Sequence, residues 1–163
     1  MEAYVTTKAE QALFNGLPGS IVPQSNTLGT QLAHRKVAIR GSYKFSRDGG
    51  AVSTISLKDE NGVAITLPAG LIITYGLIVA GASPIVSGGT PTFDIGIAGG
   101  AEFKSGLAYS AVDGANEATL AVPVPATAST AVITTAGLLT LKVITAAITA
   151  GDLDVFLEGF YRE

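Results

Sequence analysis

The stretch KVAIRGSYKFS, residues 36–46, decides the fold because its polar and apolar side chains alternate. One face carries Val37, Ile39, Gly41, Tyr43 and Phe45. The opposite face carries Lys36, Arg40, Ser42, Lys44 and Ser46. A period of two is typical of a strand with one face against a core and the other toward solvent. The stretch therefore predicts a half-buried β-strand.

The segments that follow this strand carry turn and strand signals. Asp48-Gly49-Gly50 predicts a tight turn, because glycine adopts positive φ without steric cost. The chain then returns as a second strand over residues 51–57. Further on, Leu71–Ala80 is apolar at nearly every position, which predicts a strand covered on both faces. One face would meet the domain core, and the other could meet a second subunit.

Strand patterns continue to the end of the chain. Further strands are expected over residues 92–97, 117–124, 131–135, 138–145 and 153–161. About eight strands with frequent turns and no long helix predict an all-β fold, an antiparallel β-sandwich of jelly-roll-like form. Residues 1–34 contain five glycines and prolines and little periodicity. We expect an extended N-terminal arm over 1–34 and a β-sandwich domain over 35–163.

The charge content is low for a chain of 163 residues. Only 14% of the residues are Asp, Glu, Lys or Arg, against a typical value of about 25%. This indicates surface that is buried between subunits, hence a homo-oligomer, although a Thr/Ser-rich surface on an ordinary β-domain is the alternative. The net charge of -3 disfavours nucleic acid as a partner. Residues 66–93 and 118–141 are uncharged, but their Pro, Gly, Val, Ile and Thr content predicts strands and turns rather than membrane spans.

The residue types needed for catalysis are few. His34 is the single histidine and stands beside two cations, and no Gly-x-Ser-x-Gly motif occurs. One histidine without cysteine cannot supply a zinc site, so we expect no enzyme activity, no cofactor and no metal centre. The carboxylate pairs Asp59-Glu60 and Asp152/Asp154 are interpreted as solvated turn and strand-edge residues. Calcium binding at Asp48 or at Asp152/Asp154 stays open, since calcium takes oxygen ligands from loops.

A cluster of cations marks the first strand. Its five members are Arg35, Lys36, Arg40, Lys44 and Arg47. Three of them, Lys36, Arg40 and Lys44, share one strand face by parity. We predict that the cluster binds an acidic surface of a partner protein. The alternative is a solvated edge strand, whose charges prevent edge-to-edge pairing.

Several short motifs resemble those of small structural proteins of tailed bacteriophages. The motifs are Gly41–Phe45 (GSYKF), Asp48–Ile55 (DGGAVSTI), Leu67–Ile73 (LPAGLII), Ser87–Gly96 (SGGTPTFDIG) and Ile148–Asp152 (ITAGD). The resemblance covers roughly residues 35 to 161, and it departs from the family at Lys44, where the family usually has Asp.

The resemblance implies a virion protein that is assembled in the host cytoplasm. The expected function is that of a capsid decoration (cement) protein, which forms a homotrimer and binds the major capsid protein or another virion protein of the assembled shell. The alternative is a tail or fibre component that acts as a carbohydrate-binding module on the host surface. The family supplies no catalytic residue to carry over.

Overall fold

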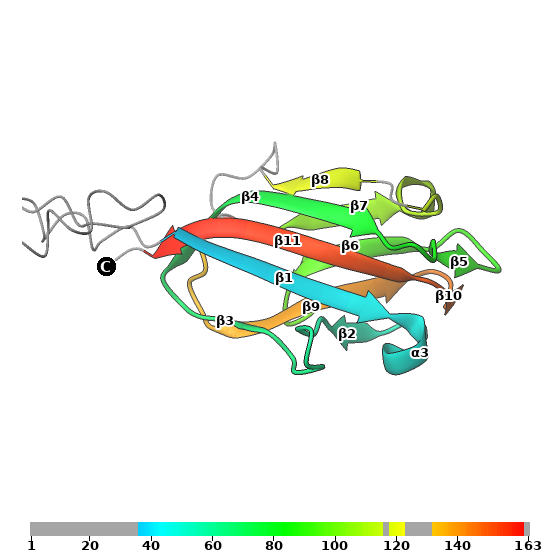
Figure 1. The fold of residues 1–163 in the computed structure, drawn as a ribbon, viewed down its shortest axis with the longest axis horizontal. Coiled ribbons are helices and arrows are strands. Elements are labelled where there is room, and N and C mark those ends of the chain that lie inside the picture. The colour runs from blue at the N-terminus through cyan, green and yellow to red at the C-terminus, as the bar shows by residue number, and fades with distance from the viewer. Residues whose placement is uncertain (1–35, 116–117, 123–131, 162–163) are drawn as a thin grey trace, which may run out of the picture. The chain divides into compact units, whose positions relative to one another are not determined.

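The computed structural model describes residues 36–115, 118–122 and 132–161. The expected N-terminal arm, His34 and Arg35 lie outside the described residues. The described part contains strands in two main sheets, one small sheet and two short helical turns (Figure 1). No helix in it is long and apolar enough to cross a membrane.

The first main sheet has four strands in the order β1-β11-β4-β8. Their bounds are β1 Lys36–Lys44, β11 Asp152–Tyr161, β4 Leu71–Ala80 and β8 Ala118–Val122. The second main sheet has the order β2-β9-β6-β7, with β3 paired to β9. Its strands are β2 Thr54–Ser56, β9 Gly137–Ile144, β6 Thr92–Ile97, β7 Lys104–Ala108 and β3 Thr66–Leu67. A small sheet pairs β5 (Val86–Ser87) with β10 (Ile148–Ala150).

The topology confirms the predicted all-β antiparallel sandwich. Every strand pair is antiparallel. Eight strands remain when the short β3, β5 and β10 are left out. Numbered by their order along the chain, the strands lie side by side as 1-8-3-6 in the first sheet and as 2-7-4-5 in the second. This interleaving is the order of a jelly roll, in which two Greek keys form a double sheet.

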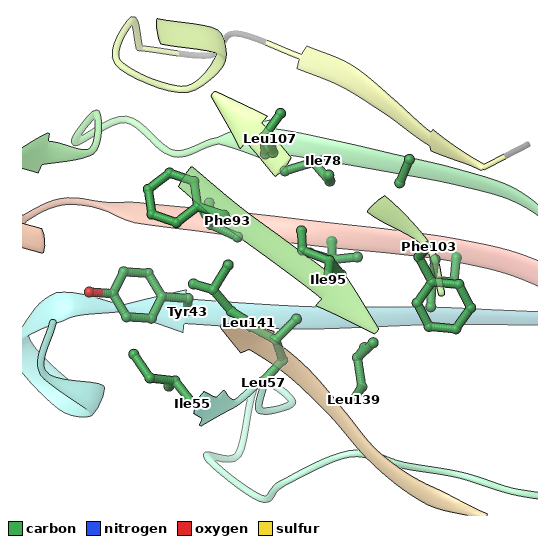
Figure 2. Close-up of a cluster of buried hydrophobic side chains, with 14 of the residues drawn as sticks. Tyr43, Ile55, Leu57, Ile78, Phe93, Ile95, Phe103, Leu107, Leu139 and Leu141 are labelled. Carbon is green, nitrogen blue, oxygen red and sulfur yellow. The ribbon is translucent and has the colours of Figure 1, made fainter. Parts of the chain in front are cut away.

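The core lies between the two main sheets. Tyr43 and Ile78 come from the first sheet, and Phe93, Ile95 and Leu141 come from the second, all fully or almost fully buried (Figure 2). Alternate residues of each strand point inward, as the period of two requires. The inner face of β1 is therefore the one that the alternation of residues 36–46 predicts.

The first strand ends earlier than predicted. Phe45–Asp48 forms one helical turn, α3, and Gly49 follows with φ 70. The expected tight turn does not lead into a hairpin, because β1 pairs with β11 whereas β2 pairs with β9 in the other sheet. The chain crosses between the sheets here, and contact with β1 is kept at the bridge between Ser42 and Lys58.

Other segments also differ from the prediction. No strand is predicted between residues 97 and 117, but this segment contains β7 and the 3-10 helix η2 (Tyr109–Ala111). The strand expected at 131–135 is reduced, among its described residues, to a single bridge between Val132 and Ile72. Short strands and bridges carry few residues, so their periodicity is too brief to detect in a sequence.

Candidate functional site

The outward side of the β1-β11-β4-β8 sheet carries a row of large apolar side chains. On β11, Leu153, Val155 and Leu157 are buried, so Phe156 and Phe160 point outward and are partly exposed. The register places Phe156 opposite Leu77 and Phe160 opposite Ile72. We call the following outward residues the apolar face: Ile72, Tyr75, Leu77, Val79, Phe156 and Phe160. Tyr75 is the most exposed of the six, at 41%.

The outward side of the other main sheet is polar in its central rows, although Leu138 near the start of β9 is 39% exposed. Asp94 on β6 lies opposite Lys142 on β9, which in turn lies opposite Thr54 on β2. In the next row Thr140 lies opposite Ser56, and its buried hydroxyl bonds to the backbone of Gly96 and Gly99. An exposed apolar area is informative when it is contiguous, because such areas mark interaction sites. The contrast between the two sheets makes the apolar face the candidate interaction surface.

Ion pairs border the apolar face on the side of β1. Lys36 Nζ lies 3.1 Å from Glu158 Oε2, and Arg40 Nη2 lies 2.7 Å from Asp154 Oδ2. The Arg40 guanidinium also stands over the ring of Phe156, 5.6 Å from its centroid. Exposed pairs of this kind contribute little to stability. Their effect is to give the apolar face a charged but locally neutral border.

A cavity of about 370 Å³ opens at the end of this border. It is lined by Arg40, Ser42, Lys44, Arg47, Lys58, Asp59, Glu60 and Asn61. One wall is the outward face of β1, the second is α3, and the third is the loop of residues 58–61. The loop is held against β1 because Ser42 and Lys58 exchange backbone hydrogen bonds of 2.7 and 3.1 Å. We call this site the basic cavity, since its lining has four cations and two carboxylates.

A buried carboxylate organises the basic cavity. The side chain of Asp48 is only 1% exposed, and it accepts hydrogen bonds from Lys58 Nζ at 2.7 Å and Arg47 Nη2 at 2.8 Å. The backbone N–H of Lys44 donates a third, at 3.0 Å. Burial by itself raises the pKa of Asp48, but the hydrogen bonds from Arg47, Lys58 and Lys44 outweigh it and lower the pKa to about 2. Asp48 is therefore ionised and fixes the α3 turn to the 58–61 loop.

The neighbouring Tyr43 ties the same turn to the core. Its hydroxyl donates a hydrogen bond of 2.7 Å to the carbonyl oxygen of Gly49. Burial, together with the negative charge of Asp48, raises the pKa of Tyr43 to about 12. The phenol thus stays protonated and keeps its donor role across the physiological pH range.

The predicted cations divide into three groups in the structure. Lys36, Arg40 and Lys44 do share the outward face of β1, and within the described chain Lys44 is exposed and forms no ion pair. Arg47 is directed to the buried Asp48, so its main contact is internal. Arg35 lies outside the described residues. Lys58 was missed, because its place in the cavity depends on a bridge between segments sixteen residues apart and no local pattern marks it.

The carboxylate pairs have ordinary structural partners. Asp154 is paired with Arg40, and Asp59 Oδ1 accepts backbone N–H bonds from Asn61 and Val63, which shape its own loop. Asp48 is already neutralised by two cations. Across residues 36–115, 118–122 and 132–161, no group of three or more His, Cys, Asp or Glu side chains is placed to hold a metal ion.

The architecture recurs in chains of three phage capsid structures. A chain in the capsid of Ralstonia phage GP4 is 18% identical, with a TM-score of 0.53, and the match covers 91% of this chain and 93% of that one. A chain in the capsid asymmetric unit of cyanophage Pam1 is 14% identical, with a TM-score of 0.53 and coverage of 90% and 98%. A chain in the acid-stable capsid of Helicobacter pylori bacteriophage KHP30 is 13% identical, with a TM-score of 0.52 and coverage of 80% and 91%.

This chain shares its fold with proteins found in phage capsids. At identities below 20% the likeness shows the fold. It agrees with the resemblance to phage structural proteins that the sequence motifs indicate. No protein-family model and no curated protein sequence matches the chain.

Proposed function

We propose that this chain is a virion structural protein and, more specifically, a capsid decoration (cement) protein that oligomerises and binds the assembled phage shell. The observation that supports the proposal most is the likeness in fold to chains of three phage capsids, in matches that cover 80–91% of this chain. A protein that binds only the assembled shell stabilises that shell by mass action. Such a role needs interaction surfaces and no catalytic group.

The apolar face supports association with other chains. Four of its residues are large aliphatic or phenylalanine side chains that face each other across two neighbouring strands, in the pairs Leu77–Phe156 and Ile72–Phe160. Burying apolar surface gains about 25 cal/mol per Å², which favours covering this face by another subunit. We propose that the homotrimer forms through it. The N-terminal arm, proposed over residues 1–34, would then reach a neighbouring subunit or the shell.

Light scattering on the purified chain tests the oligomer. We expect three times the mass of the single chain for the wild type and a smaller species for Leu77→Ser, because a hydroxyl replaces an apolar contact at the centre of the apolar face. Leu138→Ser is the matched control, since Leu138 is 39% exposed on β9 of the other sheet. A wild-type monomer, or equal effects of the two substitutions, would contradict the assignment of this face.

Shell binding tests the decoration role itself. Empty shells assembled from the major capsid protein of the same phage would be mixed with the purified chain and separated by sedimentation. We expect saturable binding to assembled shells and none to unassembled capsid protein. A chain that does not cosediment with shells, or that binds both forms equally, would refute the decoration role.

A further inference from the structure

Among the described residues, the outer edge of β1 has no strand partner along its first half. Ser42 directs its backbone N–H and C=O away from β11, since both are bonded to Lys58. The pairing of β1 with β11 runs from Lys36 to Lys44 without a register shift. Because hydrogen-bonded and non-bonded pairs alternate in an antiparallel ladder, Ala38 and Arg40 direct their N–H and C=O groups to the same outer side. No described residue pairs with these groups.

The open edge leads into the basic cavity. Arg40 belongs to both, as its backbone is part of the edge and its side chain lines the cavity. Beyond it, the 58–61 loop occupies the edge at Ser42. A strand added along Ala38 and Arg40 would therefore end at the cavity mouth. At roughly 3.3 Å per residue, a segment of about six residues spans both features.

The charges of the cavity select the occupant. Arg40 is paired with Asp154, and Asp48 accepts from both Arg47 and Lys58. Of the four lining cations, the Lys44 ammonium is the one without an ion pair among the described residues. An anionic side chain is the complement of such a site, because charge-assisted hydrogen bonds are the stronger kind. A second copy of β1 does not fit, since two-fold pairing about Ala38 would set Lys36 opposite the other copy's Arg40. Like charges directly opposite each other destabilise a strand pair.

We propose that the open edge of β1 and the basic cavity together bind an extended acidic segment of a partner protein. The segment adds to β1 as a further strand through Ala38 and Arg40, and it places a carboxylate beside Lys44 in the cavity. Strand addition of this type gains affinity from main-chain bonds and specificity from side-chain sites. The inference rests on the proposed function for the source of the segment, a shell protein, whereas the site itself is a property of this chain.

Fluorescence anisotropy on the full chain tests the site with defined peptides. The probe is a labelled, terminally blocked octapeptide in which Asp alternates with Val, and the matched peptide has Asn in place of Asp. We expect the Asp peptide to bind about tenfold more tightly, which corresponds to about 1.4 kcal/mol and to the weaker hydrogen bonds to charged groups. Equal binding of the two peptides, or no binding at millimolar concentration, would overturn the inference.

Two substitutions separate the cavity from the edge. Lys44→Ser should abolish the preference for Asp over Asn, whereas Lys142→Ser, on the outward side of the other sheet, should leave it unchanged. Ala38→Pro should weaken both peptides by about tenfold while leaving the ladder to β11 intact, because the proline removes an N–H that points outward. Unchanged peptide binding in Ala38→Pro, with its thermal unfolding as in the wild type, would refute strand addition.

Shell sedimentation keeps this inference distinct from the proposed function. If Ala38→Pro and Lys44→Ser bind shells like the wild type, the decoration role stands and the edge site is wrong. If the peptides bind as expected but the wild type does not bind shells, the edge site stands and the decoration role is wrong.

Discussion

Replacing Asp48 by Asn removes the one buried charge that joins α3 to the 58–61 loop. The side chain is 1% exposed and keeps its size in the variant, so packing is preserved and the ionic contribution is isolated. The pKa of Asp48 is lowered from 3.8 to about 2. At 1.36 kcal/mol for each pH unit, this fall corresponds to about 2 kcal/mol of stability at neutral pH.

The loss of stability in Asp48→Asn should not rise much above about 2 kcal/mol. Breaking a buried pair costs 3–5 kcal/mol when the remaining charge is trapped away from water. Here the side chains of Arg47 and Lys58 are 27% and 28% exposed, so water reaches both cations after the substitution. We therefore expect Asp48→Asn to lower the free energy of unfolding by about 2 kcal/mol at pH 7, or the melting temperature by about 4–8 °C.

The pH dependence of this stability difference tests whether the charge of Asp48 causes it. The folded-state pKa lies below the unfolded value, so the contribution is complete above pH 5 and is lost as the pH falls toward 2. The difference between wild type and Asp48→Asn should be about 1.3 kcal/mol at pH 3 and below about 0.5 kcal/mol at pH 2. Urea unfolding at one fixed protein concentration measures it, because any oligomer would add to the apparent stability.

A carboxyl outside this cluster provides the control. Asp113→Asn changes an exposed side chain at the end of η2 and should shift the free energy of unfolding by less than about 0.5 kcal/mol at every pH. A difference between wild type and Asp48→Asn that is the same at pH 7 and pH 2, or that is absent at pH 7, would refute the reasoning.

Three further substitutions test local features by thermal or urea unfolding. Gly50→Ala should lower the free energy of unfolding by about 3 kcal/mol, because the added Cβ would lie 2.1 Å from the carbonyl oxygen of Ile148. In the control Gly88→Ala the added Cβ meets no atom within 4 Å, so stability should change by less than about 0.5 kcal/mol. Similar effects of the two substitutions would contradict the close approach at Gly50. Tyr43→Phe should cost about 1 kcal/mol through loss of the hydrogen bond to Gly49, and a neutral result would show that this bond is not formed in solution. Arg40→Ser should cost less than about 1 kcal/mol, since its pair with Asp154 is exposed, and a larger loss would assign it a structural role.

The long strands could be predicted from the sequence because their inner faces have a regular period. The predicted strand at 92–97 has the same bounds as β6, and the one at 153–161 differs from β11 by one residue. The inward residues of β1 are those of the alternating pattern. Burial of one face requires such a pattern, so the pattern can be recognised from the order of polar and apolar residues.

The basic cavity could be predicted only in part. The cations of β1 are adjacent in sequence and were recognised, but the burial of Asp48 depends on three segments that meet only in the folded chain. The Asp48-Gly49-Gly50 motif indicates a turn, and nothing in it distinguishes a solvated carboxylate from a buried one. Lys58 reaches the site through long-range pairing with Ser42, which has no local signal.

The Leu71–Ala80 strand shows why the outer surface is the informative part of this molecule. Its sequence predicts cover on both faces, yet Leu77 and Val79 are partly exposed and Tyr75 is 41% exposed. The inner faces alone specify the sandwich, so the packing of this chain does not require apolar residues on the outside. The second sheet has the same inward packing, with Asp94 and Lys142 as an outward pair. The homotrimer that we propose would supply the cover that the sequence of β4 predicts, and the neutral border of ion pairs would allow a second chain to approach without charge repulsion.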